Sequence, residues 1–179
     1  MSTGGRLGSM SKGVILCVDD DSTVLNALRV LLSKIFGSDN VIEIAEGGEE
    51  ALEIVEEYAA EGTTVSVIVS DYIMPNMRGD ALLVALHERS PNTIKIMLTG
   101  QSDLEGVKKA INHANLYRFL EKPFNNADLV LTLRSALHAF HQESQLRDEI
   151  RALQQELAAS AAALQAKEAE LAQLRAGRT

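Results

Sequence analysis

The sequence predicts an α/β fold in which a parallel sheet of five strands carries helices on both faces. Short apolar runs alternate with amphipathic stretches five times between residues 14 and 138, and this alternation is typical of βα units in a parallel sheet. Polar residues follow four of the five apolar runs, as expected where strands end at one edge of such a sheet. Hydrophobic residues make up 46% of the 179 residues, enough for a core.

Clear start and stop signals mark the first two βα units. Residues 14–18 form a compact apolar run, and Asp21 precedes a helical pattern that Gly37 ends. We interpret Asp21 as the N-cap of this helix, because aspartate is a favoured capping residue. Residues 41–45 are the second expected strand, and a helix is expected over about residues 49–58.

The remaining units follow the same plan. Pro91 stops one helix, and Ser102 or Asp103 is expected to cap the next. The other expected elements are strands at residues 65–70, 94–98 and 117–120, a helix over residues 80–89, and a long helix that Asn126 opens.

Polar side chains collect at the carboxyl ends of the expected strands. Asp19 and Asp20 follow the first strand, and Asp71 follows the third. Clustered carboxylates without a nearby cysteine suit a hard cation such as Mg²⁺. Thr99 and Lys122 follow the fourth and fifth strands, and both can hold phosphoryl oxygens. A carboxylate can also attack phosphorus, so this edge predicts phosphoryl transfer to an aspartate.

At these positions the sequence resembles the receiver domain of two-component response regulators, of the type found in chemotaxis regulators. The motifs that carry the resemblance are VDDD, SDYIMPNMRGD, IMLTG and YRFLEKPF, each at a strand end and in the family's order. The resemblance implies a doubly wound, flavodoxin-like sheet with strand order 2-1-3-4-5. It also implies a sensor histidine kinase or a phosphotransfer protein as the phosphoryl donor.

The resemblance further implies a role for each matching residue. Asp71 matches the phosphoacceptor, and Lys122 matches the lysine that pairs with the phosphate. Pro123 matches the proline whose preceding peptide bond is cis in the family. The expected Mg²⁺ ligands are Asp19, Asp20, Asp71 and the backbone carbonyl of Ile73, and the expected switch residues are Thr99 and Phe119.

Three positions qualify this assignment. Arg78 stands where the family often has an acidic residue, a change that would alter kinase docking or loop charge without removing the metal site. Ile73 has an aliphatic side chain that cannot orient an attacking water, so we expect spontaneous dephosphorylation not to be fast. Phe119 has an alternative interpretation as an ordinary core residue.

The C-terminal forty residues predict a coiled coil. They contain no proline and, before Gly177, no glycine, and helix-forming residues dominate them. We expect a parallel two-stranded dimer; the alternatives are antiparallel docking and a helix packed on the receiver. The seam consists of Leu146, Ile150, Leu153, Leu157, Leu164, Leu171 and Leu174. The expected organisation is a flexible leader over residues 1–12, a receiver over 13–138, a helical dimerisation segment over 139–176 and a tail over 177–179.

Net charge, hydropathy and cysteine content indicate which cellular compartment and which partners to expect for this protein. The net charge is −8 and no basic stripe is present, so we expect no direct nucleic-acid binding. No apolar run approaches the length of a membrane span. The chain has one cysteine, Cys17, which we interpret as a buried reduced thiol. These features indicate a cytoplasmic protein.

Two functions from different classes remain open at this point. In the first, the chain is a phosphorylation-controlled dimeric switch in a phosphorelay, with no enzymatic activity beyond phosphorylation of its own Asp71. In the second, it is the receiver and linker of a larger signalling enzyme, such as one that makes or degrades a cyclic dinucleotide. A degenerate receiver that never takes phosphate is disfavoured, because the acidic pair, Asp71, Thr99 and Lys122 are all present.

Overall fold

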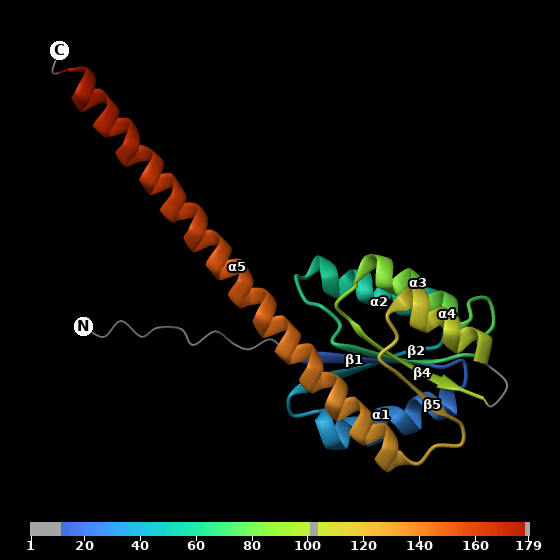
Figure 1. Cartoon of the computed structure of the whole chain (residues 1–179). Helices are drawn as coiled ribbons and strands as arrows, with labels where there is room; N and C mark the ends of the chain where they lie inside the picture. The colour runs from blue at the N-terminus through green and yellow to red at the C-terminus, as the bar shows by residue number, and fades with distance from the viewer. Residues whose placement is uncertain (1–11, 101–103, 178–179) are drawn as a thin grey trace, which may run out of the picture. The chain divides into compact units, whose positions relative to one another are not determined.

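The computed structural model describes residues 12–100 and 104–177 (Figure 1). The chain divides into two compact units, one ending at Phe140 and the other beginning at His141. Residues 1–11 of the expected leader, the expected cap at Ser102 or Asp103, and residues 178–179 of the expected tail lie outside the described residues.

The first unit is built on one parallel sheet of five strands in the order β2-β1-β3-β4-β5. This order confirms the predicted doubly wound sheet. The ladder places Asp71 opposite Leu98 and Thr99 opposite Glu121. The strands are β1 (Gly13–Val18), β2 (Asn40–Ala45), β3 (Val67–Asp71), β4 (Ile94–Thr99) and β5 (Arg118–Glu121).

Helices cover both faces of the sheet (Figure 1). One core cluster packs α2, α3 and α4 on one face, and a second packs α1 and the start of α5 on the other. In β1, Leu16 faces the first cluster and Cys17 the second, as the two-residue period of a strand requires. The helices are α1 (Ser22–Phe36), α2 (Gly48–Ala60), α3 (Gly79–Arg89), α4 (Leu104–Ala114) and α5 (Asn126–Ala176).

The element boundaries differ from the predicted ones by one or two residues. Strands β3 and β4 each extend one residue further, so Asp71 and Thr99 are the last strand residues rather than the first loop residues. Both residues are polar but pair with the neighbouring strand, which extends β3 and β4. The hydrophobic pattern of the sequence does not show such pairing, so the predicted strands ended one residue earlier.

The predicted N-cap of α1 is confirmed. The Asp21 carboxylate accepts a hydrogen bond of 2.8 Å from the backbone N–H of Thr23. At the other end, the N–H of Gly37 donates to the carbonyl of Ser33 at 3.0 Å. Asp21 therefore serves the helix, whereas Asp19 and Asp20 remain available for the edge of the sheet.

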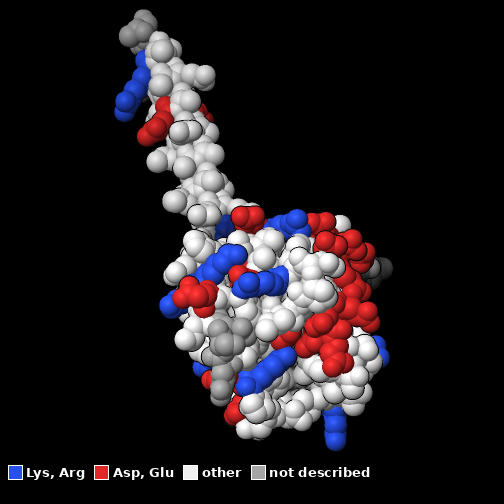
Figure 2. Space-filling view, turned by 90° about the vertical axis from the view of Figure 1, so that its right-hand side faces the viewer, with Lys and Arg blue, Asp and Glu red and all other residues white. Residues whose placement is uncertain are grey.

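Acidic side chains crowd one side of the molecular face in Figure 2. Helix α2 carries five exposed glutamates, and its first turn contains only acidic charges. Such a surface repels phosphate backbones. The five residues are Glu49, Glu50, Glu53, Glu56 and Glu57.

The second unit is helical from His141 to Ala176. Its large apolar side chains are open to solvent, from 53% exposed at Leu171 to 71% at Leu157. Among the residues that the structure describes, no helix combines the length and hydropathy that a membrane span requires.

Candidate functional site

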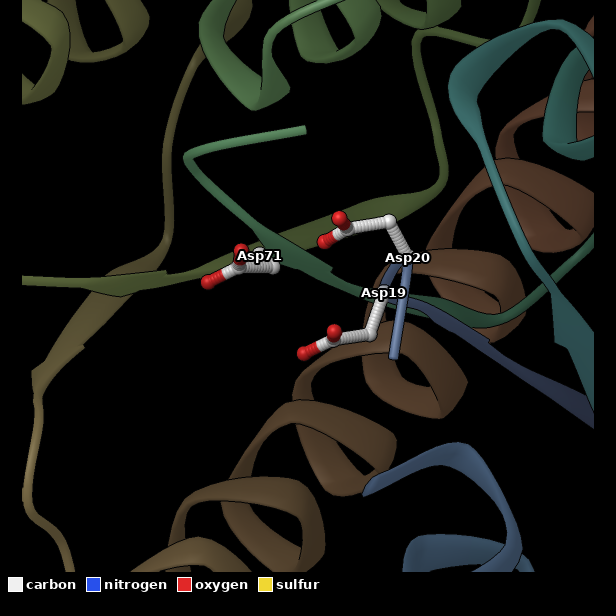
Figure 3. Close-up of side chains that lie close together, drawn as sticks. All are labelled: Asp19, Asp20 and Asp71. Atoms are coloured by element: carbon white, nitrogen blue, oxygen red, sulfur yellow. The ribbon is translucent and has the colours of Figure 1, made fainter. Parts of the chain in front are cut away.

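Three carboxylates meet at the carboxyl edge of the sheet (Figure 3). Asp19 and Asp20 follow β1, and Asp71 ends β3, which lies next to β1. One oxygen from each carboxylate lies within 4.8 Å of the other two. Asp19 and Asp71 are buried, whereas Asp20 is exposed. Residues more than fifty positions apart in the sequence thus form one acidic cluster.

Asp19 is the most deeply buried carboxylate of this cluster. Its Oδ1 accepts a hydrogen bond of 2.9 Å from the N–H of Asp21, while its Oδ2 has no hydrogen-bond partner among the described residues. Burial raises the pKa of Asp19, and the charge of Asp71 raises it further, against the Asp21 N–H and the charge of Lys122. A buried carboxylate oxygen of this kind is a suitable ligand for a cation.

The cluster has one close cation among the described residues, Lys122. Its Nζ lies 2.6 Å from Asp71 Oδ1 and 3.7 Å from Asp19 Oδ2. Burial lowers the pKa of Lys122, but the hydrogen bonding and charges of Asp71 and Asp19 together outweigh burial and raise it. The Lys122 N–H donates to the Thr99 carbonyl at 2.7 Å. The Lys122–Pro123 peptide bond is cis, which confirms that prediction.

The remaining expected site residues lie on neighbouring elements. Thr99 ends β4 and is 3% exposed. Phe119 lies on β5 and is 44% exposed, so it is not a core residue in this structure. Ile73 follows β3, and its side chain is 66% exposed. The seven seam residues belong to the second unit and take no part in this cluster.

Sequence reasoning missed a group of residues close to Asp71. Tyr72, the residue after Asp71, is 5% exposed. Asp80 is buried although it lies in the first turn of α3, where an acidic residue is usually solvated. Its charge was visible in the sequence, but its burial depends on how α3 meets α4.

Cys17 lies within β1 and is fully buried, which confirms the predicted buried thiol. Burial raises the pKa of Cys17 to about 12. The thiol is therefore protonated and shielded at neutral pH, and it belongs to the core rather than to the site.

Comparison with known proteins identifies the same part of the chain. Residues 15–134 match the family model of the response regulator receiver domain. The chain is 31% identical over 139 residues to the DNA-binding transcriptional regulator NtrC of Escherichia coli K12, covering 78% of this chain and 28% of NtrC. It is 33% identical over 132 residues to the transcriptional regulatory protein CpxR of the same organism, covering 73% of this chain and 52% of CpxR.

Solved structures agree with this assignment. The signal receiver domain of an HD domain-containing protein from Pseudomonas fluorescens Pf-5 is 34% identical with a TM-score of 0.65, covering 73% of this chain and 98% of that one. An adenylate cyclase structure from Rhodopirellula baltica is 30% identical with a TM-score of 0.70, covering 78% and 98%. With an acidic cluster and a lysine at the edge of a 2-1-3-4-5 sheet, the chain belongs to the response regulator receiver domain family.

Proposed function

We propose that this protein is a phosphorylation-activated response regulator whose phosphoacceptor is Asp71. The observation that carries the proposal is the hydrogen bond of 2.6 Å between Lys122 Nζ and Asp71 Oδ1, beside two further carboxylates. The bond holds the carboxylate at the sheet edge, and the lysine is placed to offset charge that builds up on phosphoryl oxygens.

The phosphoryl donor in this proposal is a sensor histidine kinase or a phosphotransfer protein carrying a phosphohistidine. A carboxylate oxygen of Asp71 attacks the phosphorus and forms an O–P bond. The P–N bond of the donor breaks, and the leaving histidine nitrogen keeps the electron pair. Lys122 then exchanges its bond to Asp71 for one to a phosphoryl oxygen.

The acidic cluster fits Mg²⁺. Its donors are all oxygens, they lie within 4.8 Å of one another, and Asp19 presents an oxygen without a hydrogen bond among the described residues. We propose that Asp19, Asp20, Asp71 and the backbone carbonyl of Ile73 hold the ion. When bound, it would neutralise charge on the phosphoryl oxygens.

The proposed switch lies on the next two strands. Thr99 ends β4, and its carbonyl accepts a hydrogen bond from the backbone N–H of Lys122. Phe119 lies on β5 and is half-exposed. Phosphorylation adds about two negative charges and three acceptor oxygens. We propose that the Thr99 hydroxyl moves to the phosphoryl group and that Phe119 turns inward into the space, which changes the face formed by α4, β5 and α5.

The exposed seam of the second unit supports the proposal of a parallel homodimer. Its seven side chains are each more than half exposed, and they occupy a and d positions of one heptad frame. In a parallel pair, Glu170 at a g position faces Arg175 at an e position of the second copy. Ser160 and Lys167 at d positions weaken the middle of the seam.

The comparisons do not favour the alternative of a receiver joined to a cyclic-dinucleotide enzyme. The curated relatives NtrC and CpxR are named as transcriptional regulators. The chain spans only 28% of NtrC and 52% of CpxR, so the output of this protein and its cytoplasmic location stay predictions.

Mass spectrometry after incubation with acetyl phosphate and Mg²⁺ tests the proposed function. One added phosphoryl group is expected on the unsubstituted chain and none on Asp71→Asn, which keeps the size of the side chain but removes the nucleophilic carboxylate. Equal phosphorylation of both proteins would exclude Asp71 as the acceptor.

A further inference from the structure

Tyr72 ties the proposed phosphoacceptor strand to α4. Its ring is buried, and the guanidinium carbon of Arg78 lies 4.6 Å from the ring centroid, within cation–π range. Gly106 of α4 packs so closely on this ring that a Cβ atom there would overlap it. Tyr72 directly follows Asp71, and its ring contacts α4 directly. A movement of the end of β3 would therefore displace α4 as well.

Asp80 provides a second connection to the same helix. Its carboxylate is only 6% exposed; Oδ2 lies 3.2 Å from Lys109 Nζ on α4, and Oδ1 lies 3.5 Å from Arg78 Nε. Both cations are at least half exposed. A buried carboxylate needs such partners to offset its lost hydration, so α3 and α4 are held together by charge as well as by apolar packing.

The two connections share Arg78 and form a closed series of contacts. The series runs from Gly106 to Tyr72, Arg78, Asp80 and Lys109, and it begins and ends on α4. We call these five residues the α4 clamp. Its centre is the Arg78–Gly79–Asp80 segment, which includes the position where the sequence departs from the receiver pattern.

We propose that the α4 clamp holds α4 in the arrangement of the unphosphorylated protein and thereby raises the threshold for activation. The proposal rests on the proposed function of Asp71. In the described arrangement Lys122 contacts Asp71 directly and Phe119 is half-exposed, and these are the two features that the proposed switch changes on phosphorylation. An interaction made in one arrangement and weakened in the other shifts the equilibrium by its difference in free energy.

The substitution Lys109→Gln tests the clamp, because it removes the α4 cation and leaves Tyr72 and Gly106 in place. Lys108→Gln is the matched control: it removes the neighbouring charge from the same helix, where Lys108 pairs with Glu105 at 3.0 Å. Lys109→Arg keeps the charge and should behave as the unsubstituted protein.

Two measurements on the full chain decide the outcome. Amide hydrogen exchange without phosphate should become about threefold faster in α4 for Lys109→Gln, and beryllofluoride with Mg²⁺, a phosphoryl mimic, should bind about threefold more tightly. Neither value should change in Lys108→Gln.

Unchanged exchange in Lys109→Gln would show that the ion pair does not hold α4. Faster exchange with unchanged or weaker beryllofluoride binding would show that the clamp sets no threshold. Failure of the unsubstituted protein to bind beryllofluoride would instead contradict the proposed phosphoacceptor, so the two failures are distinguishable.

Discussion

The substitution Gly106→Ala sets two opposing effects against each other in α4. Alanine is the better helix former, and in a helix interior it gains about 1 kcal/mol over glycine. The new Cβ atom would, however, overlap the ring of Tyr72. That ring is 5% exposed and lies against Arg78, so it cannot yield as the end of a flexible side chain would.

The free-energy cost of the steric overlap is expected to outweigh the gain in helix propensity. Overpacking a well-filled core costs about 1–3 kcal/mol, which equals or exceeds the gain of about 1 kcal/mol in helix propensity. We therefore expect Gly106→Ala to lower the free energy of unfolding by roughly 1 kcal/mol net, which corresponds to a fall in Tm of about 2–4 °C for a chain of this size.

Thermal unfolding followed by near-ultraviolet circular dichroism is the appropriate assay, since it reports on packed tyrosines rather than on the helix of the second unit. The sharper test uses Tyr72→Ala as the background. Without the ring the clash is absent, and Gly106→Ala should then raise Tm. A higher Tm for Gly106→Ala in the presence of Tyr72, or the same change in both backgrounds, would refute the reasoning.

Four further predictions follow from the site, the core and the seam. Millimolar Mg²⁺ should raise the Tm of the unsubstituted protein by relieving carboxylate repulsion, and should do so less in Asp20→Asn; equal melting temperatures with and without the ion would contradict the metal site. Burial raises the pKa of the Cys17 thiol in the folded state from its ordinary value of 9.0 to about 12. The stability that depends on the protonated thiol is therefore complete below about pH 9 and is lost as the pH rises toward 12, and Cys17→Ala should make this decline smaller in urea titrations at several pH values. Leu157→Lys should convert the dimer to a monomer in light scattering, because it buries a charge at an a position; a monomeric unsubstituted chain at tens of micromolar would remove the dimer. Thr99→Ala should still accept phosphate from acetyl phosphate but lose the phosphorylation-dependent change in β5 and α4 hydrogen exchange, and an unchanged response would contradict the switch.

Much of the acidic cluster could be predicted because parallel strands end at a common edge. Asp19 and Asp71 each follow an apolar run, and adjacency of β1 and β3 in the sheet then brings them together. Asp21 could likewise be separated from its two neighbours, since an aspartate before a helical pattern has a local role that does not depend on the rest of the fold. These inferences needed only local sequence and the geometry of one sheet.

The α4 clamp depended on the tertiary structure. Asp80 and Lys109 are 29 residues apart and both resemble solvated surface charges in the sequence, because nothing local to either residue reports the distance between α3 and α4. The burial of Tyr72 against Gly106 is of the same kind: it results from the close approach of α4 to the side chain of the residue that follows β3.

Sequence alone therefore determined the fold class, the order of the elements and the residues at the strand ends, because these follow from periodicity and from the rule that sites form beyond the ends of parallel strands. The tertiary structure decided which charges are buried, which pairs of helices they join, and that Phe119 is half-open rather than packed in the core. Burial and pairing depend on distances between segments that are remote in the chain, and a one-dimensional pattern does not contain those distances.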